Sequence, residues 1–327
     1  MSHLLDFFVD LAELRLLKAG ERLALGYRAG VVTDRLQSSS LTFGRYRSRS
    51  HVSAALTPEW QLARDDRRTW TVLAGATFDD TNREASALSP VVEVSRTAPA
   101  GVLRRIFAGY ARTTQVATYT ALNSAPGAGL FRGNPDLGRS SSHQVELGAA
   151  GDWRGWEFEG AWFVRRDLRL VDWTFRRGVT ARTANAVDID NTGIELFARR
   201  SWQRASLMIG YAWLRKDADY GTASVDASFY ALNFPEHRVT AAVIGTLGRG
   251  VEVRVDNELR WQSDNLLRVQ GGDSAALTTV GIYWRVPRVR GLTLSAQIEN
   301  AWDSDFQEVP AVPASPRQSA VGLTYQW

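Results

Sequence analysis

The sequence contains no cysteine, and this absence excludes disulfide frameworks and thiolate metal sites. Histidine is scarce, and the four residues stand far apart in the chain: His3, His51, His143 and His237. Isolated imidazoles do not form the clusters that metal sites and catalytic triads require. We therefore predict no metal site and no cofactor.

Long apolar runs are also missing. No stretch approaches the ~20 consecutive apolar residues that a membrane-spanning helix needs, and the mean hydropathy is −0.23. The N-terminal stretch "MSHLLDFFVDLAELRLL" lacks a basic start and carries Asp6 and Asp10 inside its apolar part. It does not match a signal peptide, so we expect the chain to have none.

Lysine is nearly absent, because only Lys18 and Lys216 accompany the many arginines. The arginines alternate with aspartate and glutamate along the chain and form no basic patch, so a nucleic-acid partner is not expected. The motifs G-x-S-x-G and H-E-x-x-H and the Walker A loop are absent as well. We predict that the protein is not an enzyme and has no catalytic residues.

What the sequence does have is a period of two. In "VEVRVDNELRW" (251–261), apolar residues fall on one parity and charged residues on the other, with Asn257 as the exception. Successive side chains of a strand point to opposite faces, so this strand has one apolar and one charged face. Such a strand suits both a soluble sandwich, with water on its polar side, and a transmembrane barrel, with lipid on its apolar side.

The lengths of the connections favour the barrel. Short turns are expected at 18–21, 64–68, 97–101, 152–155, 201–204, 248–250 and 287–291. They alternate with longer polar stretches at 36–46, 79–88, 113–142, 166–187, 216–236, 262–275 and 303–317. Outer-membrane barrels have short periplasmic turns and long outside loops. Tryptophans near predicted strand ends suit aromatic girdles: Trp153, Trp156, Trp202, Trp213, Trp261, Trp284 and Trp302.

Four motifs, in order along the chain, resemble the barrels of TonB-dependent receptors. They are "GNPDL" at 133–137 followed by "ELG" at 146–148, "NTGIEL" at 191–196, "NFPEHRVT" at 233–240, and "IENAWDSDFQ" at 298–307 with the terminal aromatic Trp327. The resemblance covers about 24–327. The chain departs from the family pattern at Gly138 and Arg139, which occupy the usual "KPE" slot, and at Trp302, which replaces the common Phe.

The resemblance implies an all-β fold, an antiparallel up-and-down transmembrane β-barrel in the outer membrane. The chain has room for about 14 to 16 strands, whereas a complete receptor barrel has about 22. We therefore expect 1–327 to be a single barrel domain, the C-terminal part of a receptor barrel without its N-terminal plug, in which residues 1–10 mark a truncation, a misassigned start or a split gene.

The resemblance also implies uptake of a scarce small-molecule ligand, such as a siderophore or a cobalamin-like molecule, with TonB acting through a plug that this chain lacks. Other expected partners are outer-membrane lipid, lipopolysaccharide, and the barrel-assembly machinery at the Trp327 strand. The expected ligand-binding residues are Glu252, Arg254, Asp256, Glu258 and Arg260 on the lumen wall and Arg176, Arg177 and Arg182 in an outside loop. A porin-like or enzymatic outer-membrane barrel and a soluble β-sandwich binding module remain alternatives.

Overall fold

The computed structural model describes residues 4–7, 15–18, 22–42, 47–64, 67–127, 129–265, 267–310 and 312–327. The turn expected at 18–21 and the start segment at 1–10 fall largely outside these residues. Within the described chain, eighteen strands and one five-residue helix are present, and sixteen of the strands have four or more residues. In the same residues, no helix is both long and apolar enough to cross a membrane.

The chain forms two compact units, each described here by itself. Unit 1 comprises Met1–Ala149, Phe163–Thr192 and Lys216–Leu232, and unit 2 comprises Ala150–Trp162, Gly193–Arg215 and Asn233–Trp327. Four long strands contribute residues to both units: β9 (Ser140–Trp153), β10 (Trp156–Arg176), β11 (Val179–Ser201) and β12 (Ala205–Asp219).

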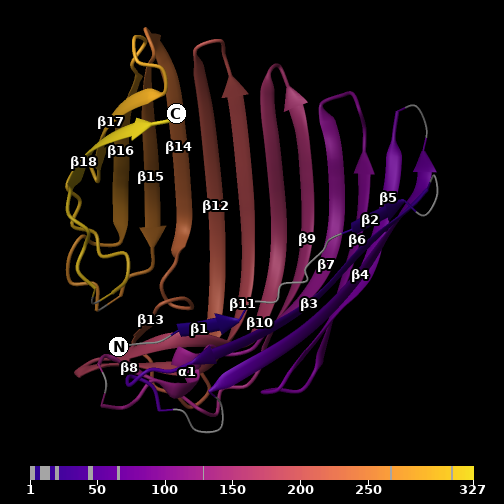
Figure 1. The fold of residues 1–327 in the computed structure, drawn as a ribbon, viewed down its shortest axis with the longest axis vertical. Helices are drawn as coiled ribbons and strands as arrows, with labels where there is room; N and C mark the ends of the chain where they lie inside the picture. Colours follow the sequence, from indigo (N-terminus) through magenta and orange to yellow (C-terminus); the bar gives the residue numbers. More distant parts are fainter. Residues whose placement is uncertain are drawn as a thin grey trace. The chain divides into compact units, whose positions relative to one another are not determined.

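Unit 1 contains a run of strands that pair with their neighbours in sequence. They are β3 (Leu23–Leu36), β4 (Ser48–Arg64), β5 (Thr69–Thr81), β6 (Ala87–Thr97) and β7 (Leu103–Gln115) (Figure 1). Every consecutive pair is antiparallel, and the free edge of β3 pairs with β1 (Leu4–Phe7) and β2 (Arg15–Lys18). This meander confirms the all-β, up-and-down prediction.

Unit 2 repeats the same arrangement. Its strands β14 (Pro235–Gly248), β15 (Val251–Gln262), β16 (Ser274–Arg285), β17 (Leu292–Glu299) and β18 (Gln318–Tyr325) pair antiparallel in sequence order, and β14 also pairs with β12. Short turns at 249–250 and 286–291 alternate with longer connections at 263–273 and 300–317, as the sequence predicts. Gly250 has φ +81°, a conformation that side chains rarely adopt, which suits the tight β14–β15 turn.

The faces of β15 follow the predicted parity. Val255 is opposite Val243 of β14 and Val280 of β16, and Leu259 is opposite Val239 and Ala276. On this apolar face Leu259 and Trp261 are exposed, whereas Arg260 and Gln262 on the opposite face are buried. The other face carries Asp256 opposite Ala242 and Thr279. The exposed side of the sheet is thus the apolar side, the reverse of a soluble sandwich.

Buried apolar side chains gather away from the wall, in the connections of unit 1. One cluster combines Ala117, Ala121, Leu137 and Ala184, and a second combines Val187, Ile189 and Ala231. The helix α1 (Tyr119–Asn123) and the two-residue strands β8 (Phe131–Arg132) and β13 (Ala227–Ser228) lie at the same end of the long strands (Figure 1). The long connections therefore form a packed layer.

One predicted loop is wrong. Residues 166–187 form the far halves of β10 and β11, joined at Arg177 and Gly178. The polar content of this stretch suggested a loop, but its residues Leu170, Val171 and Trp173 pack against the two buried clusters. Both faces of the hairpin are covered, which a single sequence pattern does not reveal.

Candidate functional site

The charged face of β15 forms a chain of ion pairs in unit 2. The Glu258 carboxylate accepts a hydrogen bond from Arg238 Nη2 at 2.8 Å and another from Arg260. Arg260 also pairs with Glu308 at 3.0 Å, and its side chain is only 8% exposed. A charge this buried is stabilised by its partners, because an unpaired one would cost several kcal/mol.

The remaining predicted wall residues are more exposed. Arg254 pairs with Asp256 at 2.7 Å, and Glu252 lies 3.5 Å from Arg285. All five residues predicted on this strand therefore share one face and take part in ion pairs. Their role as ligand contacts stays a prediction, since paired side chains also serve to neutralise the wall.

The three predicted outside arginines have different surroundings. Arg176 and Arg177 are exposed at the tip of the β10–β11 hairpin, where the Arg177 backbone N–H donates to Asp226 at 2.6 Å. Arg182 is half-buried, with its guanidinium 4.8 Å from the centre of the Phe175 ring. The Arg182 guanidinium thus contacts an aromatic ring, whereas Arg176 and Arg177 are exposed to solvent.

The hairpin carries a short strand on each edge. Strand β8 pairs parallel with β11, with Arg182 opposite Phe131, and strand β13 pairs antiparallel with β10, with Thr174 opposite Ser228. The segment with α1 packs against Val171 and Trp173, and residues near Ala231 pack on the other cluster. The result is a small layered body built from the connections 116–139 and 218–231 and the hairpin 166–187.

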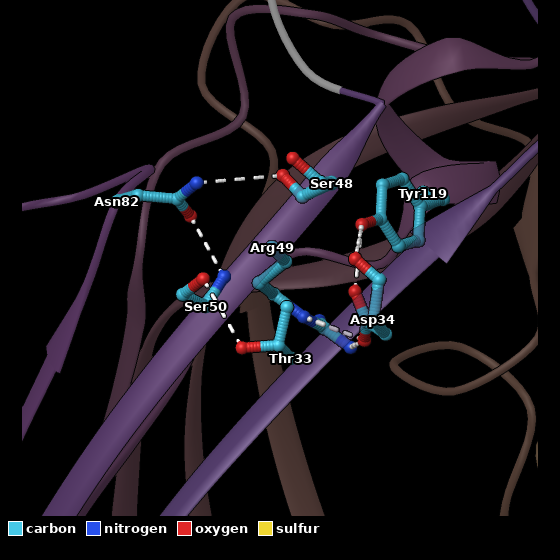
Figure 2. Close-up of polar contacts among 7 residues, drawn as sticks. All are labelled: Thr33, Asp34, Ser48, Arg49, Ser50, Asn82 and Tyr119. Carbon is cyan, nitrogen blue, oxygen red and sulfur yellow. Dashed lines mark hydrogen bonds and ion pairs between the residues drawn. The ribbon is translucent and has the colours of Figure 1, made fainter. Parts of the chain in front are cut away.

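Two polar anchors tie the α1 segment to the wall of unit 1. The Tyr119 hydroxyl donates to Asp34 Oδ1 at 2.6 Å, and Arg49 Nη2 contacts Asp34 Oδ2 at 2.5 Å (Figure 2). Burial, followed by the hydrogen bond to Asp34, raises the pKa of Tyr119 to about 12. The second anchor joins Arg139 to Asp79 in a buried ion pair, so a residue that departs from the family pattern has its own partner.

The motif "GNPDL" forms the inner turn of this segment. The Gly133 N–H donates to Ser124 at 3.0 Å, and the Asn134 N–H donates to Ala121 at 2.7 Å, which satisfies carbonyls near the end of α1. A Cβ on Gly133 would lie 2.5 Å from the Ser124 nitrogen. The motif glycine is therefore required by a close backbone approach.

A cavity of about 330 Å³ lies within this layer. Two cationic side chains, Arg165 and Lys216, and two aromatic ones, Trp173 and Tyr230, line it. Arg165 Nε donates to Asp167 at 2.9 Å, and Asp167 accepts a second bond from Asn191 at 2.8 Å. The cavity thus places two cationic side chains, one of them paired with Asp167, beside aromatic residues, a combination suited to small ligands.

Sequence reasoning missed every one of the four cavity residues. Two signals were present in the chain: Lys216 is one of only two lysines, and Asp172 interrupts the apolar stretch "LRLVDWTF". Neither is specific, because a lone lysine or aspartate is most often a solvated surface residue. The cavity depends on three connections meeting, and no local pattern encodes that meeting.

Comparison with known proteins adds the family. The model of the TonB dependent receptor-like β-barrel matches residues 7–301. No curated protein matches the chain.

Among solved structures, the FrpB iron transporter from Neisseria meningitidis (F3-3 variant) is similar with a TM-score of 0.68 and 14% identity, over 95% of this chain and 53% of that chain. The siderophore receptor PirA from Pseudomonas aeruginosa is similar with a TM-score of 0.67 and 14% identity, over 95% of this chain and 53% of that chain. The copper transporter OprC is similar with a TM-score of 0.62 and 14% identity, over 93% of this chain and 54% of that chain.

The chain spans about half the length of these solved structures, and at such low identity they share its fold alone. The family match is independent of them and covers most of the chain. The chain belongs to the TonB-dependent receptor-like β-barrel family, whose members are outer-membrane receptors and not enzymes.

Proposed function

We propose that this chain supplies barrel wall and outer-side connections to a receptor that takes up a scarce ligand across the outer membrane, of the siderophore or cobalamin-like class. Energy reaches such a receptor from TonB through a plug domain that lies outside the 327 residues. The residues 1–327 act as one barrel domain in this proposal. Outer-membrane lipid and lipopolysaccharide surround it, and the strand ending at Trp327 meets the assembly machinery.

The observation that supports this proposal most directly is the cavity in the layer of connections. It combines Arg165 and Lys216 with the rings of Trp173 and Tyr230 in about 330 Å³. A porin that conducts passively has no need of a cavity lined by cationic and aromatic residues, whereas a receptor that captures a dilute ligand does. The charged side chains on β15 (Glu252, Arg254, Asp256, Glu258, Arg260) and the hairpin arginines (Arg176, Arg177, Arg182) complete the proposed contact set.

An uptake experiment tests the function. Cells carrying the complete receptor gene, or a deletion of it, are grown under iron limitation and then under cobalamin limitation, with the radiolabelled ferric siderophore or cobalamin supplied. We expect accumulation that needs both the receptor and the proton-motive force. Accumulation that survives collapse of that force favours the porin-like alternative, because porins conduct passively.

A further inference from the structure

Tyr230 is exposed in an unusual way. The residue lines the cavity and is 54% exposed, although Ala227, Ser228 and Ala231 near it are buried. The surroundings of Tyr230 show how its position is fixed.

Asp172 holds the backbone on one side of the ring. Its carboxylate is fully buried and accepts hydrogen bonds from the Tyr230 N–H at 3.1 Å and the Ala231 N–H at 2.9 Å. The Tyr220 hydroxyl donates a third bond at 2.8 Å, so both ends of the segment 220–231 meet on one carboxylate. Burial and the adjacent Asp172 charge raise the pKa of Tyr220, so this donor stays protonated to a higher pH than an ordinary tyrosine.

Lys216 holds the backbone carbonyl of Tyr230. Its Nζ donates to the Tyr230 carbonyl at 2.9 Å. The N–H and C=O of Tyr230 are therefore both bonded to charged side chains, and such bonds are roughly twice as strong as neutral ones. The ring of the preceding residue, Phe229, packs edge-on against the Phe175 ring, with 5.2 Å between the ring centres. This contact restrains the backbone further.

We propose that Asp172 is a positioning residue that fixes Tyr230 as a preformed contact for a ring-bearing anionic ligand in the cavity. The inference rests on the proposed function, because it names how that cavity recognises its ligand. Tyr230 and Trp173 bring aromatic side chains to the cavity, while Arg165 and Lys216 bring two cationic groups, with Asp167 and Asp172 as the neighbouring carboxylates. A ring held in place before binding loses little conformational freedom when the ligand arrives.

The test measures binding of 2-naphthoate, with neutral 2-naphthamide as the comparison, to the purified full-length protein in detergent by equilibrium dialysis. We expect Tyr230→Ala and Asp172→Asn each to weaken 2-naphthoate binding about tenfold, since each removes a single strong contact or its support. Asp190→Asn is the matched control, because Asp190 lies on the same hairpin with a side chain 67% exposed. We expect that variant to bind within about twofold of the unsubstituted protein.

A double-mutant cycle separates positioning from general structural support. If Asp172 acts through Tyr230, the double variant Asp172→Asn with Tyr230→Ala binds no more weakly than Tyr230→Ala alone. A spin label on Ser224→Cys, unique in a chain without cysteine, should also become more mobile in Asp172→Asn.

Additive losses in the cycle, or unchanged binding in Asp172→Asn, overturn the positioning role. Absence of 2-naphthoate binding to the unsubstituted protein overturns the ligand class. The uptake experiment then still decides the proposed function on its own, because it measures force-dependent accumulation and not this probe.

Discussion

Single residues on the paired strands β15 and β16 face two different environments. Val255 belongs to the exposed apolar face and Thr279, opposite Asp256, belongs to the charged face. In a family of outer-membrane barrels the first face meets hydrocarbon and the second meets the lumen. The same substitution at the two positions therefore has different consequences.

We expect Val255→Arg to lower the free energy of unfolding by about 2–4 kcal/mol, because a cation near the middle of the lipid face is poorly solvated. Thr279→Arg introduces the same side chain opposite Asp256 and should cost less than about 1 kcal/mol. Urea unfolding in lipid vesicles measures both. Equal losses would contradict the assignment of the two faces.

A second residue-scale prediction concerns the Tyr119 anchor. Tyr119→Phe removes a hydrogen bond to the Asp34 carboxylate and should weaken the attachment of α1 by about 1.5–3 kcal/mol, the range for bonds to charged groups. Hydrogen exchange at the amides of 119–124 measures this local loss. Protection there equal to that of the unsubstituted protein would show that Arg49 and the remaining contacts suffice.

The same anchor should depend on pH in a defined direction. The pKa of Tyr119 is raised to about 12 in the folded chain, above the ordinary value of 10.0. Its contribution to stability is therefore complete below pH 10, and it falls as the pH rises from 10 through about 12. Amide protection of α1 should follow that course in the unsubstituted protein and stay flatter in Tyr119→Phe.

At the scale of elements, the connection 116–139 is organised by its motif turn. Gly133 lies against the backbone of α1, and its Cβ position is filled by neighbouring atoms. Gly127 in the same connection has open space around the corresponding position and no positive φ. These two glycines form a natural pair for comparison.

We expect Gly133→Ala to displace the turn from α1 and to cost about 1–3 kcal/mol in local stability, whereas Gly127→Ala should be nearly neutral or slightly stabilising. Limited proteolysis of the purified protein, read by mass spectrometry across 116–139, provides the measurement. Similar cleavage in both variants would mean that the segment relaxes around the added methyl group.

At the scale of the whole molecule, the alternation of short and long connections predicts which side of the outer membrane each connection faces. Within unit 1, Ser39 lies in the connection between β3 and β4, and Ala100 lies in the short turn between β6 and β7. Both are exposed. In a barrel with long connections outside, only the first is reachable from the medium.

The absence of cysteine makes this directly testable. In intact cells carrying the complete receptor, a membrane-impermeant thiol reagent should label Ser39→Cys and leave Ala100→Cys unlabelled until the outer membrane is opened. Labelling of Ala100→Cys alone in intact cells would invert the topology. It would also place the proposed ligand cavity on the periplasmic side.

Most strands, their two faces and the alternation of connections were predictable from the sequence alone. Period-two patterning such as that of 251–261 is a local property, and each residue's parity is fixed by the extended backbone. The resemblance of "GNPDL" and the later motifs indicated the family, and the family match confirms it, which removes the soluble sandwich from the alternatives. The five charged residues of β15 fell on one face as predicted.

The roles of the connections follow from long-range packing and not from any local sequence pattern. The stretch 166–187 looked polar enough to be a loop, yet it is a hairpin, because other connections bury both of its faces. Asp172 lies 58 residues and Lys216 14 residues before Tyr230 in the chain, and both side chains hydrogen-bond to the Tyr230 backbone. Long-range meetings of this kind depend on packing energy summed over several segments, and no spacing along the chain records them.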